Sequence, residues 1–97
     1  MHKLIVSLDT LTPEQARENI LQISRESREY SSQILFKFND LLALLGLYGI
    51  SDLISDLDVS LMLDPKWHDI PHTIRNYFQQ LANSGISEKV SYVTIHA

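Results

Sequence analysis

The sequence contains no cysteine, which limits the chemistry open to the protein. A disulfide framework and a thiolate metal site both need cysteine side chains, so both are excluded. A chain without cysteine is compatible with the reducing cytoplasm, and we expect a cytoplasmic protein.

Basic residues are also few. The chain has 8 lysines and arginines against 12 aspartates and glutamates, which gives a formal net charge of -4. The basic residues are scattered singly along the chain. A nucleic-acid-binding surface needs a basic patch, so the charge argues against such a surface and we expect no nucleic-acid partner.

Long hydrophobic runs are missing. The longest is 41–45, LLALL, far short of the roughly 20 residues of a membrane-spanning helix. No basic start leads into an apolar run of the kind found in signal peptides, so we expect no membrane partner. With 97 residues, of which 44% are hydrophobic, the chain is expected to form one domain, 1–97.

Strand-like and helix-like segments alternate along this domain. The apolar, β-rich runs predict strands at 4–8, 34–38, 59–63 and 90–95. Helices are predicted from a capping box at Thr12 and Gln15, over 41–54 with a break near its glycines, and from Pro71 to a C-cap at Gly85; the polar stretch 25–32 is expected to end the first helix and loop back. Alternating strands and helices indicate an α/β fold with a parallel sheet.

Charged residues follow the expected strands. Asp9 comes after the first strand, Lys37 lies near the end of the second, and Asp64 and Lys66 follow the third. In parallel α/β folds, ligands bind at the carboxyl ends of strands. Aspartate is also common in turns, and for Asp9 taken alone a turn is the better interpretation.

Lys37 stands among apolar residues of a strand that is expected to be buried. An unpaired buried ammonium is costly, so this lysine needs a carboxylate partner, for which Asp64 on the neighbouring strand is the candidate. The alternative is an edge strand with Lys37 facing water.

The most informative stretch is 64–73, DPKWHDIPHT. Asp64 and Lys66 are two residues apart and can share one face of an extended segment. Asp69 lies just before the helix expected to start at Pro71, where a carboxylate suits the helix N-terminus. Taken alone, Asp69 would be interpreted as a helix cap.

The whole stretch, with its pattern Asp-x-Lys-x-x-Asp and the extension His-Asp-Ile-Pro at 68–71, resembles the signature of orotidine 5'-monophosphate decarboxylases. The segments 4–9 (LIVSLD), 36–38 (FKF) and 94–97 (TIHA) are similar to the first, second and fourth strands of that family. Sibling sugar-phosphate decarboxylases and aldolases share the short pattern, and the extension points to the orotidine enzyme.

The resemblance implies an enzyme that converts orotidine 5'-monophosphate to uridine 5'-monophosphate in pyrimidine biosynthesis, with a catalytic set of Lys37, Asp64, Lys66 and Asp69. Asp64 would lie beside the substrate carboxylate and bind Lys37. Lys66 would deliver a proton to C6 of the pyrimidine after carbon dioxide leaves. Alternating charges can keep one another ionised in a dry pocket, and an ammonium at C6 stabilises and then protonates the carbanion. No cofactor is needed.

The resemblance also implies the substrate contacts. Asp9 and Lys37 would contact the ribose hydroxyls. Asp69, Ile70 and Thr73 would project into the site of a partner subunit, so a homodimer with shared sites is expected.

Histidines raise the question of a metal site. His68 and His72 are four residues apart, a familiar ligand spacing on a helix. Pro71 falls between them, however, and His68 precedes the expected helix. Structural or surface histidines are therefore the better interpretation, and we expect no metal.

The expected fold is thus the (βα)4 half of a TIM barrel: a parallel β-sheet with alternating helices. The family's phosphate-binding loop and lid belong to the other half, so the isolated chain is expected to be inactive. The sequence leaves open whether the chain is a fragment, a truncated product or half of a split enzyme.

Two other functions stay open at this point. One is a sugar-phosphate decarboxylase or aldolase of the same superfamily, a group that usually uses a magnesium ion. The other is a non-catalytic α/β interaction module, whose exposed half-barrel edges would pair with a second chain.

Overall fold

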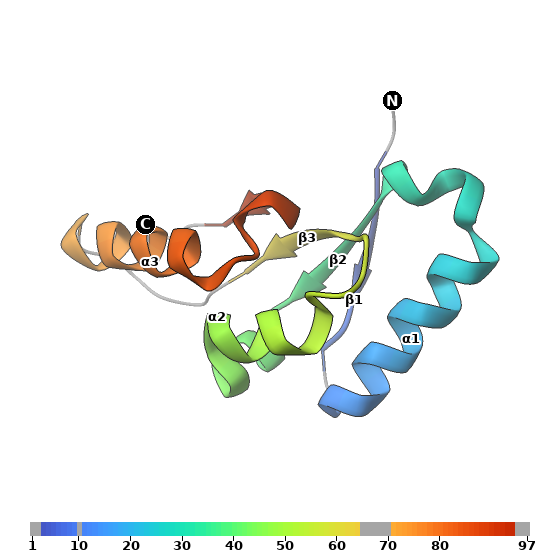
Figure 1. The fold of residues 1–97 in the computed structure, drawn as a ribbon, viewed down its shortest axis with the longest axis horizontal. Coiled ribbons are helices and arrows are strands. Elements are labelled where there is room, and N and C mark those ends of the chain that lie inside the picture. The colour runs from blue at the N-terminus through green and yellow to red at the C-terminus, as the bar shows by residue number, and fades with distance from the viewer. Residues whose placement is uncertain (1–2, 10, 65–70, 95–97) are drawn as a thin grey trace.

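The computed structural model describes residues 3–9, 11–64 and 71–94, and within 71–84 it describes the side chains of 76 and 78–84. Helices follow strands throughout this part of the chain (Figure 1). The elements are β1 (Leu4–Ser7), α1 (Pro13–Glu26), the 3-10 helix η1 (Arg28–Gln33), β2 (Ile34–Phe38), α2 (Asp40–Ile54), β3 (Ser60–Leu63), α3 (Pro71–Ser84), the 3-10 helix η2 (Ser87–Lys89) and β4 (Val90–Val93).

The four strands form one sheet in the order β1-β2-β3-β4, and every neighbouring pair is parallel. Ser7 lies opposite Lys37, Lys37 opposite Met62, and Met62 opposite Tyr92; an irregularity after Leu61 shifts the register of β4. Each strand therefore pairs with the next strand along the chain, through a helical crossover. The prediction of an α/β fold with an all-parallel sheet is confirmed, and the arrangement is consistent with a half (βα)4 unit.

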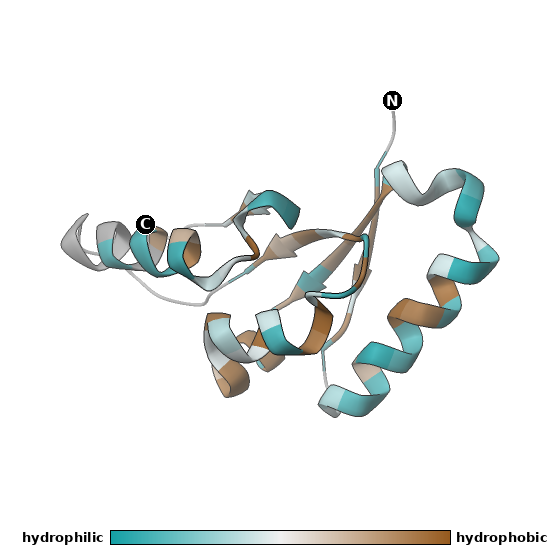
Figure 2. Cartoon of the chain, viewed as in Figure 1, coloured by the Kyte–Doolittle hydropathy of each residue, from teal (hydrophilic) through white to brown (hydrophobic). Residues whose placement is uncertain are grey.

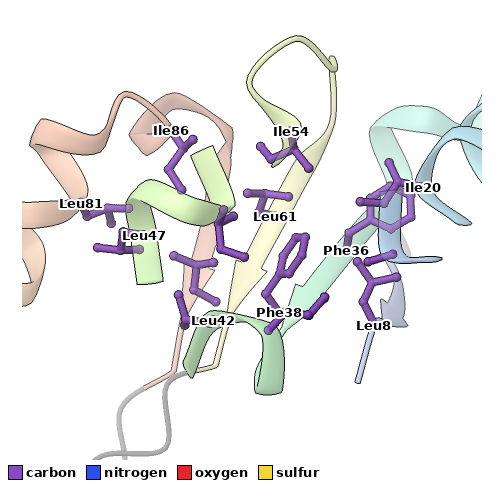
Figure 3. Close-up of a cluster of buried hydrophobic side chains, with 14 of the residues drawn as sticks. Leu8, Ile20, Phe36, Phe38, Leu42, Leu47, Ile54, Leu61, Leu81 and Ile86 are labelled. Atoms are coloured by element: carbon purple, nitrogen blue, oxygen red, sulfur yellow. The ribbon is translucent and has the colours of Figure 1, made fainter. Parts of the chain in front are cut away.

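One face of the sheet packs against the helices. Phe36 and Phe38 of β2 and Leu61 and Leu63 of β3 alternate along their strands and are buried in this cluster. Figure 3 shows Phe36, Phe38 and Leu61 beside the side chains of the helices. The helices contribute Ala16 and Ile20 from α1, Leu41, Leu42, Leu47, Ile50 and Ile54 from α2, and Leu81 from α3. Full burial of one such large side chain stabilises the fold by about 1.5–3 kcal/mol, so this layer is the core that holds the strands in place.

The opposite face of the sheet carries the remaining alternate side chains. Leu35 is buried there, whereas Ile5 and Tyr92 are 49% and 54% exposed. Lys37 and Met62 lie between them in the register. Because the helix-side cluster holds the other parity of strand residues, this face presents the side chains that a ligand could reach.

Local sequence signals set the start of α1. The Gln15 amide donates to Thr12 Oγ1 over 3.1 Å, and the Thr12 amide donates to Gln15 Oε1 over 3.0 Å, which is the predicted capping box. Helix α1 is largely hydrophilic with apolar patches (Figure 2). The polar stretch that follows differs from the expected loop, since η1 occupies most of it. The Ile34 amide donates to Ser31 O and closes the last turn of η1 before β2.

Gly46 produces the predicted break in α2. Its φ of 71° and ψ of 175° are non-helical and lie in a region that is essentially restricted to glycine. Gly85 follows α3 with a φ of 86°, in agreement with the predicted C-cap.

Among the described residues, none of the helices has the length and apolar character that crossing a membrane would require.

Candidate active site

The candidate site lies at the carboxyl edge of the sheet, where all four parallel strands end. Backbone hydrogen bonds extend the pairing just past the strands: Leu8 N donates to Lys37 O over 3.1 Å, Asp64 N to Phe38 O over 3.0 Å, and Thr94 N to Leu63 O over 3.0 Å. The residues that follow β1, β3 and β4 are therefore fixed to the sheet rather than carried on loose loops. Rigid placement of this kind is what a preorganised site needs.

An ion pair joins the second and third strands at this edge. Lys37 Nζ lies 3.5 Å from Asp64 Oδ2, and their side chains are 25% and 6% exposed respectively. The sequence-based prediction that Lys37 needs a carboxylate partner is thus met by Asp64, and the alternative of an edge strand is wrong because β2 lies between β1 and β3. The lysine is accessible, while the carboxylate is almost shut off from water.

The Asp64 carboxylate has a further partner on the fourth strand side. Thr94 Oγ1 donates a hydrogen bond to Asp64 Oδ1, the oxygen that does not face Lys37. Burying a carboxylate is costly unless it is paired and hydrogen-bonded, and here the two oxygens meet both conditions. This threonine was missed by sequence reasoning, because threonine is an ordinary strand residue.

Asp9 follows β1 and forms a hydrogen bond that is separate from the contacts of Lys37 and Asp64. Ser7 Oγ donates to Asp9 Oδ2 over 2.7 Å. The other oxygen, Oδ1, is buried and accepts no hydrogen bond within the described part of the chain. The contacts described do not join Asp9 to Lys37, although both lie at the same edge of adjacent strands. An acceptor of this kind is suited to a ligand hydroxyl or amide donor.

The other predicted site residues lie in or after the stretch that follows β3. Lys66, Asp69 and Ile70 are outside the described residues, as is His68. Thr73 belongs to the first turn of α3, but its side chain is outside the description. The structure therefore brings Lys37 and Asp64 together and leaves the roles predicted for the other residues as predictions.

Chemically, this edge can hold two opposite charges at fixed positions in a sheltered place. Lys37 has three N–H donors, so it can bind Asp64 and still donate to a polar ligand. Low exposure strengthens both interactions relative to water. Among the described residues, no three histidine, aspartate or glutamate side chains gather in a group that could hold a metal ion.

No protein-family model matches the chain, and neither the curated proteins nor the solved structures contain a match to it.

Proposed function

We propose that the chain is the N-terminal half of an orotidine 5'-monophosphate decarboxylase, a cytoplasmic enzyme of pyrimidine biosynthesis. The observation that carries this proposal is the contact between Lys37 and Asp64 at the carboxyl edge of the sheet. The proposed chemistry needs that pair at that edge, followed two residues later by a second lysine, and Lys66 occupies this position in the sequence. The resemblance of 64–73 to the decarboxylase signature supports the same conclusion.

In the proposed reaction the C6 carboxylate of the pyrimidine is placed beside Asp64. The bond between C6 and the carboxylate carbon breaks, carbon dioxide leaves, and the electron pair stays on C6. The ammonium of Lys66 donates a proton to C6, which yields uridine 5'-monophosphate and a neutral lysine that water reprotonates. Asp69 completes the alternating charges that stabilise both ammonium groups.

The substrate is held by residues outside the reacting centre. We assign Asp9 and Lys37 to the ribose hydroxyls. The buried Asp9 Oδ1, which has no hydrogen-bond partner among the described residues, is a suitable acceptor for them. Ile70 and Thr73 reach the site of a second subunit in a homodimer. No cofactor is assigned, because a fixed ammonium supplies both the electrostatic stabilisation and the proton.

The test is decarboxylation of saturating orotidine 5'-monophosphate, followed by the loss of the substrate's absorbance. The isolated chain should turn over poorly or not at all, because binding energy from the phosphate is needed to organise the reacting end. Addition of a C-terminal decarboxylase half, which carries the phosphate loop and lid, should restore turnover. Lys66→Ala should abolish the restored activity. The control is Lys3→Ala, the same substitution at a lysine that donates to Ser32 O, and it should leave the activity unchanged.

Four outcomes would contradict the proposal or a part of it. An assembled mixture without turnover would exclude decarboxylation of this substrate. Binding of a sugar phosphate only in the presence of magnesium would favour the sibling sugar-phosphate enzymes, and pairing of the two halves without nucleotide binding would favour an interaction module. Turnover by the isolated chain near that of a complete enzyme would show that the second half is dispensable.

A further inference from the structure

Thr94 sits where it can control the orientation of the Asp64 carboxylate. Its hydroxyl donates to Asp64 Oδ1, while Oδ2 of the same group lies 3.5 Å from Lys37 Nζ. A carboxylate held through both oxygens by partners on opposite sides cannot rotate about its last bond without losing one of them. The plane of the group is therefore set by the strands on either side of it.

The backbone makes this support rigid. Thr94 N donates to Leu63 O, and Asp64 N donates to Phe38 O, so donor and acceptor each extend the ladder of the sheet. Both side chains project from the end of a paired strand rather than from a mobile loop. The Asp64 side chain is only 6% exposed, so water competes little for its oxygens.

We propose that Thr94 is a positioning residue, whose hydroxyl holds the Asp64 carboxylate in the orientation that faces Lys37 and the reacting end of the substrate. The inference rests on the proposed function for its effect on turnover. Its physical basis, the contact between Thr94 and Asp64, is independent of the reaction. Thr94 itself touches neither the substrate nor the reacting atoms in this assignment.

The activity test compares Thr94→Val with Thr94→Ser in the assembled, active protein. Loss of one hydrogen bond to a charged group corresponds to a decrease in kcat of about tenfold to a hundredfold. KM should change much less, because the substrate contacts of Lys37 and Asp9 are kept. Thr94→Ser keeps the hydroxyl and should retain most of kcat.

A matched threonine elsewhere in the chain separates this effect from a loss of stability. Thr12→Val removes a hydroxyl that caps α1 through the Gln15 amide and bonds to that amide rather than to Asp64. It should lower the urea midpoint without lowering kcat at temperatures where the protein is folded. An equal loss of kcat in Thr12→Val, or a Thr94→Ser variant as impaired as Thr94→Val, would overturn the positioning role.

A double-mutant cycle tests the contact without any assay of activity. Thr94→Val and Asp64→Ala are combined, and urea midpoints of the 97-residue chain are compared; Asp64→Asn replaces Asp64→Ala if the latter does not fold. The shifts should be non-additive, because the contact between Thr94 and Asp64 is already lost once either residue is replaced. Additive shifts would overturn the inference whatever the enzyme's substrate, whereas a coupled pair in a protein without turnover would overturn the proposed function alone.

Discussion

At the scale of single residues, Asp64 combines deep burial with partners of two kinds. The ammonium of Lys37 and the hydroxyl of Thr94 each occupy a different oxygen of its carboxylate. Such a group is expensive to bury and is stable only while its partners are present. The same residue that suits the proposed chemistry is thus a point of weakness in the fold.

Replacement of Lys37 should expose this weakness. Lys37→Met keeps much of the side chain's apolar length but removes the charge nearest to Asp64 Oδ2. We expect the free energy of unfolding to fall by about 1–3 kcal/mol, measured by urea denaturation at pH 7.

The control for this variant is Lys3→Met, which changes a lysine whose ammonium donates to a backbone carbonyl, that of Ser32, and forms no ion pair within the described residues. Its effect should be smaller. Equal stability of Lys37→Met and the unaltered chain would show that the ion pair contributes nothing net. Addition of Asp64→Asn to Lys37→Met should recover part of the loss, because the buried carboxylate is then gone.

At the scale of elements, the break in α2 comes from the backbone conformation of Gly46 and not from packing against a neighbouring element. A Cβ built on Gly46 would meet nothing within 4 Å, so the cost of a side chain there is conformational. Gly46→Ala should lower the free energy of unfolding by about 1–3 kcal/mol, measured in urea. A synthetic chain with D-alanine at this position should lose less, since a positive φ is natural for a D-residue. Equal losses for both alanines would refute the argument.

A surface ion pair links α1 to the segment after α2. Arg17 donates to both carboxylate oxygens of Asp56, at 3.0 Å and 2.8 Å, and to Leu53 O at 2.6 Å. The pKa of Asp56 lies below its ordinary value, mainly because its carboxylate accepts hydrogen bonds from Arg17. The loss of water around the carboxylate acts in the opposite direction and raises the pKa, but by less. Both side chains are substantially exposed, so the stabilisation is small.

The lowered pKa of Asp56 predicts a pH dependence with a definite sign. A carboxyl group whose pKa is lower in the folded chain contributes stability above its unfolded pKa of about 3.9, and loses it as the pH falls through the folded value. The stability difference between the unaltered chain and Asp56→Asn should therefore be present at pH 7 and shrink below pH of about 4. Urea unfolding at pH 7 and pH 3 measures it. A difference that grows in acid would contradict the assignment.

At the scale of the whole molecule, the described helices cover just one of the two faces of the sheet. Ile5 and Tyr92 are exposed on the other face, and β1 and β4 are the outer strands of the sheet. Unpaired strand edges beside apolar surface favour association.

We therefore expect the isolated chain to self-associate, with a mass that rises with concentration in light scattering. Ile5→Lys should reduce the association, because a lysine on an edge strand discourages pairing. Leu44→Lys is the matched control, since Leu44 is 71% exposed but lies on α2. A chain that stays monomeric at high concentration, or equal effects of the two lysines, would contradict this expectation.

The sequence alone predicted the contacts that depend on residues close together in the chain or on the order of parallel strands. Thr12 and Gln15 cap α1 through contacts three residues apart, and such contacts are readable without a structure. The meeting of Lys37 and Asp64 followed from parallel strands, whose carboxyl ends share one edge. The contact between Thr94 and Asp64 could not be read, because it depends on the register of β4, which an irregularity after Leu61 shifts.

The strand order β1-β2-β3-β4 has a consequence for synthesis on the ribosome. Each strand pairs with the one made just before it, so no strand has to wait for a later one to be inserted between earlier neighbours. The chain segment between two paired strands is therefore short, and closing short segments costs little entropy, which favours fast folding. The nascent chain can therefore add one strand-and-helix unit at a time as it emerges, and the ammonium of Lys37 is in place on β2 before the carboxylate of Asp64 arrives.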